Sequence, residues 1–459
     1  MTRGETYFAT VGGEIKGYGT MAPGSLHDAG QLLADVSRAF GMSAEAVLLV
    51  PVMPGSGDAD EGINLAPRWA GMEASALAAG WRVTGDEGLI RDNGWATFRS
   101  MDDDRVIYMG VLSMMDQDRT PLFDLTADAE TITRRLVTYA SVTGVVWRMT
   151  AGVSGCAAVR HDRAARALEQ LTIGVGESGE PEHQGEPVEP WWRWDTAPRE
   201  LHGAGHVIWH RPLVPSERVD TARVCKYDIR AQYLAAMAGA KYGWGEPHRR
   251  ASVPYDPDRA GFWQIAASGP LSLPGPPLVR HVDRGLTWVT NRVMDHLHGK
   301  GILPMVYDSY TSPTSSQWLK PWATKIRNAL YAESDEIQDI EAALKRTYTE
   351  TNGMFNVPGG SVFRKDVHWT TIDTAMINMR VKLEHVHQTI GMWPCEIYHD
   401  AVFYPVEDKQ AFDELNLALG VKYPWDRAVI RVPIGKFRFV SSEMVPAWEA
   451  RISKKESKQ

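Results

Sequence analysis

The sequence contains few cysteines and no long apolar run. Its 459 residues include three cysteines, Cys156, Cys225 and Cys395, which are too far apart for a paired metal-ligand spacing. This predicts a reduced, cytoplasmic protein without a structural zinc site. No stretch approaches the roughly 18–20 apolar residues that span a bilayer, and the first residues show no signal-peptide core. No membrane partner is therefore expected.

Acidic and basic residues are distributed unevenly along the chain. The formal net charge is −8, with 44% hydrophobic and 23% charged residues, as in an ordinary globular protein. Residues 1–200 contain 17 Lys+Arg and 29 Asp+Glu, whereas residues 201–459 contain 32 and 28. The acidic first part and mildly basic second part predict two domains with different tasks. A basic part of this size permits a DNA-binding groove without requiring one.

Residues 1–173 alternate strand-like and helical patterns, which predicts an acidic α/β domain. Within it, Asp128 and Glu130 imitate the Asp-x-Glu metal pair of proofreading exonucleases. They open a helical pattern, where acids are favoured by the helix dipole, so we interpret them as structural. Residues 174–200 are rich in Gly, Pro and Glu and predict a linker or exposed loop.

The second part is organised around residues 224–242. A short strand pattern ends at Asp228, and an apolar helical run follows it. A carboxylate between a strand and a helix lies at the rim of a sheet, where a metal ion can reach it. The alternative is that Asp228 caps the helix, since Asp is a favoured N-cap residue.

Two later acids also lie in strand patterns. Asp400 falls inside the alternating stretch 395–406, where an unpaired charge would cost several kcal/mol unless it faces a partner, a metal ion or water. Asp308 lies near the end of a strand pattern at 302–311 and is either a third metal ligand or a turn residue. Between these acids and Asp228, residues 286–301 predict one helix closed by glycines.

Residues 316–333 and 337–353 predict two antiparallel helices joined by a short turn. Each helix has one apolar face, formed by Leu319, Ala323, Ile326 and Leu330 in the first and by Ile337, Ile340, Ala343, Leu344 and Tyr348 in the second. The opposite faces are basic and carry Lys320, Lys325, Arg327, Lys345 and Arg346. Such a face is usually solvated surface, and its position between two candidate metal ligands makes a binding role the alternative.

In this order the motifs resemble the palm and fingers of family B DNA polymerases, especially the protein-primed branch. The family's first motif, Asp-x-x-Ser-Leu-Tyr-Pro-x-x-Met, shares its Asp, Tyr and Met spacing with residues 228–237. The family's fingers motif has a Lys eight residues before a Gly in a helix that leads to an aromatic residue. Lys345, Gly353 and Phe355 repeat that spacing.

The third motif of the family, Asp-Thr-Asp-Ser, corresponds to residues 399–401, and its later Lys motif corresponds to 435–437. A closer resemblance is to the polymerase-like part of the telomere-associated proteins of linear actinobacterial replicons. It is carried by residues 344–353 and 363–369. The resemblance as a whole covers about 205–440.

The resemblance implies an α+β fold: a polymerase-type palm sheet within 201–445, with a helical-hairpin fingers insertion at about 316–353. It leaves open that the preceding α/β domain is a degenerate, inactive exonuclease-like fold. Residues 446–459 are expected to form a basic tail. Nineteen residues follow Val440, which is too few for a thumb domain that grips duplex product.

The resemblance also implies a site for Mg²⁺ or Mn²⁺ that serves two-metal phosphoryl transfer. The metal ligands would be Asp228 and Asp400, with Lys345 as a further catalytic residue. The roles implied for the remaining candidates are nucleotide binding by Tyr233, Lys345, Lys325 and Arg327, and DNA binding by Lys436, Arg438 and Arg364. The expected partners are DNA, nucleoside triphosphates and a terminal protein that serves as primer.

The sequence also departs from the family pattern. The second Asp of the third motif's pair is missing, with Tyr398 and His399 in front of Asp400, and the first motif has lost its Ser and Pro. Two functions therefore stay open. One is a thumbless nucleotidyltransferase that acts in phage, plasmid or telomere replication. The other is a catalytically inactive, polymerase-derived module that binds DNA or a terminal protein.

Overall fold

The structure is a computed structural model, and the chain divides into two units that are described separately. The first unit comprises Met1–Pro181 and Lys325–Met354, and the second comprises Glu182–Thr324 and Phe355–Gln459. The residues that the structure describes are 6–10, 15–18, 33, 45–50, 65–84, 94–111, 122–123, 127, 129–173, 194, 196–205, 208–219, 222–245, 247–267, 275–279, 282–332, 334–360, 362–421 and 432–456.

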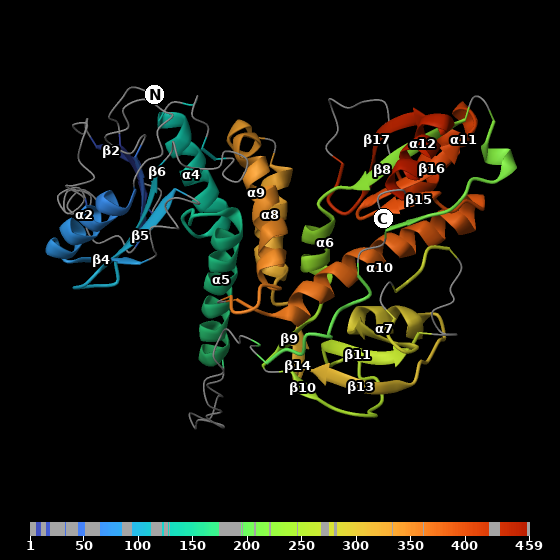
Figure 1. The fold of residues 1–459 in the computed structure, drawn as a ribbon, viewed down its shortest axis with the longest axis horizontal. Helices are drawn as coiled ribbons and strands as arrows, with labels where there is room; N and C mark the ends of the chain where they lie inside the picture. The colour runs from blue at the N-terminus through green and yellow to red at the C-terminus, as the bar shows by residue number, and fades with distance from the viewer. Residues whose placement is uncertain are drawn as a thin grey trace. The chain divides into compact units, whose positions relative to one another are not determined.

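The first unit contains a six-stranded mixed sheet in the order β2-β1-β3-β6-β5-β4. Strands β3 and β6 pair in parallel, and the other neighbours pair antiparallel. Helix α2 lies beside β4 (Figure 1). The bounds are β1 Thr6–Thr10, β2 Ile15–Tyr18, β3 Glu45–Val50, α2 Leu65–Ala78, β4 Trp81–Thr84, β5 Trp95–Ser100 and β6 Val106–Val111.

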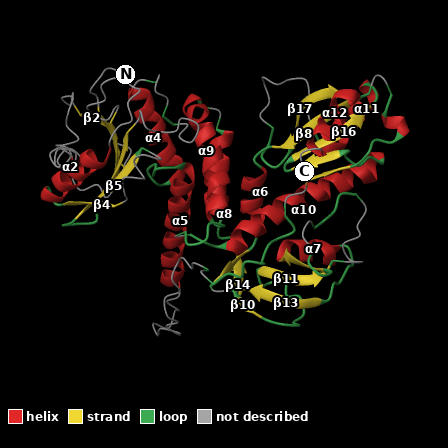
Figure 2. Cartoon of the chain, viewed as in Figure 1, coloured by secondary structure: helices red, strands yellow, loops and turns green. Residues whose placement is uncertain are grey.

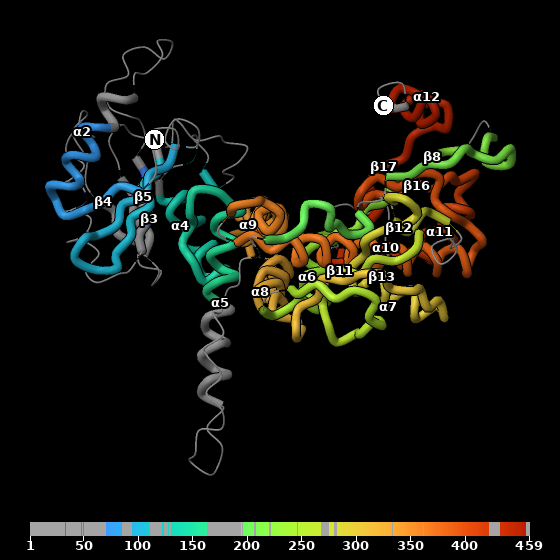
Figure 3. The backbone as a smooth tube through the Cα atoms, turned by 60° about the horizontal axis from the view of Figure 1, so that its bottom comes forward, coloured from blue at the N-terminus to red at the C-terminus, as the bar shows by residue number. Residues whose placement is uncertain are grey.

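The first unit also contains the helices α4 (Ala129–Thr143), α5 (Ala151–Ile173) and α9 (Asp335–Met354). Helix α9 packs against α5 and α4, and Figure 3 shows α9 beside them. Glu130 lies in the first turn of α4, as its structural interpretation predicts. Asp128 lies outside the described residues, as does most of the linker predicted at 174–200.

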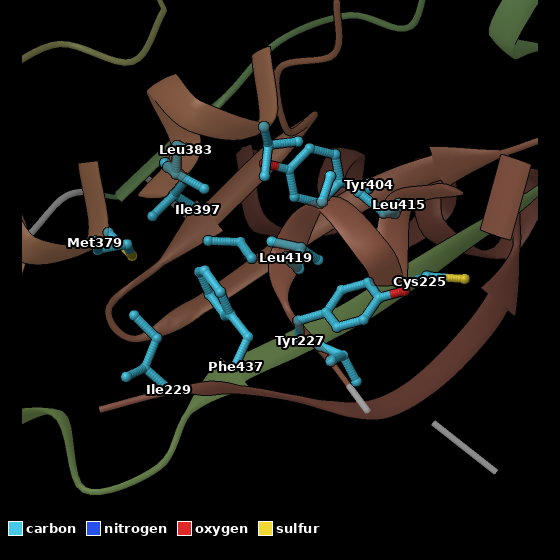
Figure 4. Packing of buried hydrophobic residues seen from close by; sticks show 14 of the residues in the cluster. Cys225, Tyr227, Ile229, Met379, Leu383, Ile397, Tyr404, Leu415, Leu419 and Phe437 are labelled. Carbon is cyan, nitrogen blue, oxygen red and sulfur yellow. The ribbon is translucent and has the colours of Figure 1, made fainter. Parts of the chain in front are cut away.

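The second unit contains a five-stranded antiparallel sheet in the order β17-β8-β16-β15-β7. One face packs against α10, α6 and α11 through a core of apolar side chains, several of which are labelled in Figure 4. The bounds are β7 Ile208–His210, β8 Arg223–Ile229, α6 Gln232–Gly239, α10 Lys365–Ile390, β15 Glu396–Tyr398, β16 Ala401–Val406, α11 Lys409–Leu419 and β17 Phe437–Met444.

A second antiparallel sheet, in the order β10-β13-β11-β12, packs on the other side of α10. Figure 2 shows this helix between the five-stranded and the four-stranded sheets, and β9 and β14 form a separate two-stranded sheet. The five-stranded sheet is therefore backed by the largely buried helix α10. The bounds are β9 Tyr242–Trp244, β10 His248–Arg249, β11 Gly261–Ala266, β12 Leu286–Thr290, α7 Asn291–Gly299, β13 Val306–Thr311 and β14 Thr314–Ser316.

The two consecutive basic helices predicted at 316–333 and 337–353 form as α8 (Lys320–Tyr331) and α9. All nine predicted apolar-face residues are buried. The helices predicted from their periodicity are therefore confirmed. The division of the chain places most of α8 and all of α9 with the first unit.

Most of the segment expected as a basic tail is helix α12 (Val445–Glu456), in which Trp448 and Ile452 are buried against the five-stranded sheet. Trp448 donates its indole N–H to the buried Glu396, which also accepts from Arg451 and Lys455. None of the described helices is long and apolar enough to cross a membrane. The described chain is α+β, as predicted.

Candidate functional site

Asp228 lies inside strand β8, one residue before its end. It is opposite Ala401 of β16 on one side and Arg438 of β17 on the other. Helix α6 begins only at Gln232, and its N-cap is Ala231, which has no capping side chain. The alternative that Asp228 caps this helix is therefore excluded.

Asp400 does not lie inside a strand, as the alternating pattern predicted. It is exposed and forms, with His399, the two-residue turn between β15 and β16. His399 adopts a left-handed conformation with φ of 57°, as tight hairpin turns require of a central residue. The prediction of one continuous strand at 395–406 is wrong because a hairpin turn interrupts it.

The turn nevertheless brings Asp400 next to Asp228. The backbone N–H of Ile229 donates to the carbonyl oxygen of Asp400 over 3.3 Å, and Asp228 is the register partner of Ala401. The two acids thus occupy adjoining backbone positions, Asp228 near the end of β8 and Asp400 in the turn before β16.

Both carboxylate oxygens of Asp228 are bound by Arg438. The Nε of Arg438 donates to Oδ1 over 2.6 Å, and its Nη2 donates to Oδ2 over 2.9 Å. The side chain of Asp228 is 19% exposed and that of Arg438 is 48% exposed, so solvent screens the pair in part. Arg438, expected to bind DNA, is thus engaged with the first candidate metal ligand.

Tyr233 lies on α6 and packs in part against the core of the five-stranded sheet. Burial raises the pKa of its hydroxyl to about 12, and the negative charge of Asp400 acts in the same direction. Tyr233 is therefore neutral at physiological pH and close to the second acid. The half-buried aromatic ring of Tyr233 therefore lies near Asp400.

Lys436 is exposed and lies just before β17, in a turn rather than in the strand that the sequence predicts. This turn is held by Arg230: its backbone N–H donates to the Lys436 carbonyl, and its carbonyl accepts from the Gly435 N–H. The Nη1 of Arg230 also donates to the carbonyl of Val432. The turn is therefore fixed two residues beyond Asp228.

Lys382 of α10 also contacts this turn and was not among the residues predicted from the sequence. Its Nζ donates to the carbonyl of Gly435 and lies 5.5 Å from the ring centroid of Phe437. Burial, together with the neighbouring charge of Lys436, lowers the pKa of Lys382 to about 8. A single lysine among the apolar residues Met379, Leu383 and Val386 was the available signal.

Arg364 is fully buried and cannot contact DNA, which corrects the expectation for this residue. It forms an ion pair with Asp366, and its Nη2 also donates to the carbonyl of Gly243. A guanidinium without exposed surface cannot reach a phosphate. Arg364 therefore fixes the start of α10 against the segment that contains β9.

Three of the residues predicted to bind a nucleotide belong to the first unit: Lys345, Lys325 and Arg327. Lys345 is exposed on α9. The Nζ of Lys325 is 2.7 Å from Oδ1 of Asp162 on α5, so this cation is engaged within its own unit. Arg327 is half-buried on α8. Their roles toward a nucleotide stay predictions.

Asp308, the other candidate ligand, lies on β13 of the second sheet. Arg249 on the neighbouring strand β10 donates from Nε to its Oδ2 over 2.8 Å, and the Ser309 N–H donates to its Oδ1. It is therefore a paired residue inside a strand, not at a turn. This pair also joins neighbouring strands, but both contacts of Arg249 go to Oδ2 of Asp308, and the pair belongs to a different sheet from Asp228 and Arg438.

The donor set at Asp228 and Asp400 fits Mg²⁺ or Mn²⁺ in kind, because both ions prefer hard oxygen ligands. Within the part of the chain that the structure describes, no group of three or more His, Cys, Asp or Glu could hold a metal ion. Two carboxylates can supply part of a shell that water and substrate phosphates complete. The residues therefore fit a metal held jointly with substrate.

Fold and site together define an α+β protein with two acids at one edge of an antiparallel sheet. No protein-family model matches the sequence, and no curated protein matches it. Solved structures of phi29 DNA polymerase do match. Its orthorhombic crystal form is 12% identical with a TM-score of 0.38, and the match covers 68% of this chain and 56% of that one.

Two complexes of the same polymerase give similar values. The complex with single-stranded DNA is 12% identical with a TM-score of 0.39, covering 76% of this chain and 67% of that chain. The binary complex with primer-template DNA is 10% identical with a TM-score of 0.40, covering 76% and 68%. This chain thus spans between about half and two thirds of the polymerase's length, and the similarity is distant.

Proposed function

We propose that this protein is a DNA-dependent nucleotidyltransferase of the family B polymerase type. The observation that carries the proposal is the register that brings Asp228 and Asp400 together at one sheet edge. In this proposal the five-stranded sheet is the palm, and α8 with α9 forms the fingers. The order of the sequence motifs supports the same assignment.

Two divalent cations, Mg²⁺ or Mn²⁺, would supply activation of the attacking hydroxyl and neutralisation of the triphosphate. Asp228 and Asp400 would hold them through their carboxylate oxygens. Tyr233 would exclude a ribose 2′-hydroxyl with its ring, which is fixed by its half-buried position. Lys436 would bind a primer phosphate, with its turn held by Arg230.

The cations of the first unit would act on the triphosphate. Lys345, Lys325 and Arg327 would stabilise its negative charge as the transferred phosphoryl group leaves. The biological setting that we propose is replication of a phage, plasmid or telomere, with DNA, nucleoside triphosphates and a terminal protein primer as partners. The acidic first domain as an inactive exonuclease relative is part of the same proposal.

A second candidate function is a polymerase-derived module that binds DNA or a terminal protein without synthesis. Two observations favour it. Arg438 already binds both oxygens of Asp228, and the described residues hold no third acid near the pair. A carboxylate that keeps its guanidinium partner does not serve as a metal ligand.

Primer extension on a short primer–template, with Mg²⁺ and then Mn²⁺, distinguishes the two functions. The variants are Asp228→Asn and Asp400→Asn. Loss of a metal-ligating carboxylate removes several kcal/mol of transition-state stabilisation, so extension should fall about 10³-fold or more in each. DNA binding is measured in parallel by fluorescence anisotropy.

Asp308→Asn is the matched control, because it neutralises a strand carboxylate that is also paired with an arginine. Its extension rate should stay near that of the wild type. If no protein extends the primer while all bind DNA, the binding module is the correct function. If extension persists in Asp228→Asn and Asp400→Asn, the proposed site is wrong.

A further inference from the structure

The ion pair between Arg438 and Asp228 is built by the sheet itself. The two residues are register partners on adjacent antiparallel strands, β17 and β8. The fork of the guanidinium meets both carboxylate oxygens at 2.6 and 2.9 Å. Such two-point pairing is the strong geometry for Arg and carboxylate, and it uses the oxygens that would face a metal ion.

Asp308 and Arg249 form another pair of this kind between neighbouring strands, on the second sheet of the unit. Arg249 also meets its carboxylate from a neighbouring strand, at 2.7 and 2.8 Å. Of the three acids proposed as ligands from the sequence, Asp228 lies beside Asp400, whereas Asp308 lies on a different sheet. At Asp228, therefore, a guanidinium and a divalent cation would compete for the same oxygens.

We propose that Arg438 is a built-in counter-ion of Asp228, which has to leave the carboxylate before a divalent cation binds there. The inference rests on the proposed function only in taking Asp228 and Asp400 as the metal ligands. Two positive groups cannot share one carboxylate at contact distance without strong repulsion. Arg438 therefore lowers the affinity of the site for metal and sets the concentration at which the site fills.

Binding of Mn²⁺ alone tests this inference, with the full chain and without DNA or nucleotide. Free Mn²⁺ is followed by electron paramagnetic resonance during titration. Arg438→Gln should bind Mn²⁺ about 3- to 10-fold more tightly than the wild type, as expected on removing a half-exposed competing ion pair. Arg438→Lys keeps the charge but loses the two-point fork, so its affinity should lie between the two.

Arg249→Gln is the matched control and should leave Mn²⁺ affinity unchanged, while Asp228→Asn should abolish the tight site. Circular dichroism melting verifies that each variant is folded. Equal Mn²⁺ affinity in the wild type and Arg438→Gln would overturn the inference, as would equal tightening in Arg249→Gln. If Asp228→Asn alone changes binding, the metal site stands and the counter-ion role fails.

The two proposals fail in different ways. A protein that never extends a primer, but binds Mn²⁺ more tightly after Arg438→Gln, contradicts the polymerase function and keeps the counter-ion. A protein that extends a primer, but whose Mn²⁺ affinity is unchanged in Arg438→Gln, supports the polymerase function and contradicts the counter-ion role of Arg438. An absence of Mn²⁺ binding in both the wild type and Arg438→Gln overturns the inference.

Discussion

Ile229 donates its backbone N–H to the carbonyl oxygen of Asp400 over 3.3 Å. This bond extends the pairing of β8 with β16 into the hairpin turn. The closeness of Asp228 and Asp400 is therefore fixed by main-chain register and not by their side chains. A substitution at either acid should leave the other in place, which makes single-acid variants clean tests of the site.

Tyr233 should decide whether deoxyribonucleotides are preferred. Its ring is half-buried on α6 and close to Asp400, so it can act as a fixed steric wall. Tyr233→Ala should reduce discrimination against ribonucleotides by about tenfold or more, as for other contacts of this size. The measurement is the ratio of extension rates with deoxyribonucleotides and ribonucleotides.

Tyr233→Phe is the control, because it keeps the ring and removes only the hydroxyl. It should retain the preference for deoxyribonucleotides. A large loss of selectivity in Tyr233→Phe would show that the hydroxyl, and not the ring, is the determinant. Unchanged selectivity in Tyr233→Ala would remove Tyr233 from the nucleotide site.

Lys436 should contribute one phosphate contact to DNA binding. A protein that neutralises one phosphate fewer shows a salt dependence that is weaker by about 0.7–0.9 in the slope of log K against log salt concentration. Lys436→Ala should show this decrease in anisotropy titrations at several salt concentrations. Lys409→Ala should not, since this exposed lysine begins α11 beyond the opposite end of β16.

Asp373 should make the stability of the second unit depend on pH. It is buried on α10 and accepts hydrogen bonds from the Thr290 hydroxyl and from the backbone N–H groups of Ala204, Gly205 and Thr290. Burial raises its pKa from 3.8 to about 6, although these hydrogen bonds act in the opposite direction. The folded state thus keeps this proton at pH values where the unfolded state has lost it.

The contribution of Asp373 to the free energy of unfolding should therefore be largest below about pH 4 and fall as the pH rises through 6. The contribution of Asp373 to this fall is on the order of 3 kcal/mol, from the size of the pKa shift. Asp373→Asn has no such titration, so its unfolding free energy should depend less on pH. Urea unfolding of both proteins between pH 4 and 7 measures the difference, and parallel curves would contradict the prediction.

Regular periodicity made part of this fold predictable. The buried face of α9, with Ile337, Ile340 and Leu344, follows from spacings of three and four residues. Residues 286–301 were predicted as one helix but form strand β12 and then α7. The β-branched residues Thr287 and Val289 favour a strand there, and the helical spacing begins only after them.

Long-range pairing could not be predicted from local patterns. Arg438 and Asp228 are 210 positions apart, and only the sheet register makes them partners. Arginine usually lies on the protein surface. Arg364 is nevertheless buried, because the carboxylate of Asp366 and the carbonyl of Gly243 accept hydrogen bonds from it. Asp400 was placed in a strand because the alternation continues on both sides of a turn without glycine.

Gly155 of α5 marks a close helix crossing in the first unit. A Cβ at this position would overlap the hydroxyl of Thr351 and lie 2.9 Å from Cγ2 of Thr347, both on α9. These threonines are fully buried, so neither can move into solvent. The approach of α5 to α9 therefore requires a residue without a side chain at Gly155.

Gly155→Ala should destabilise the first unit by about 1–3 kcal/mol, because overpacking forces the helices apart. Gly353→Ala on α9 is the matched control, since a Cβ there meets nothing within 4 Å. It should be neutral or stabilising by up to about 1 kcal/mol, because Ala has the higher helix propensity. Urea unfolding measures the stability of both variants. The two positions differ in that Gly155 lies at the contact between α5 and α9, whereas Gly353 has free space for a Cβ. Equal stability changes in the two would show that helix propensity, and not the contact between α5 and α9, determines the effect.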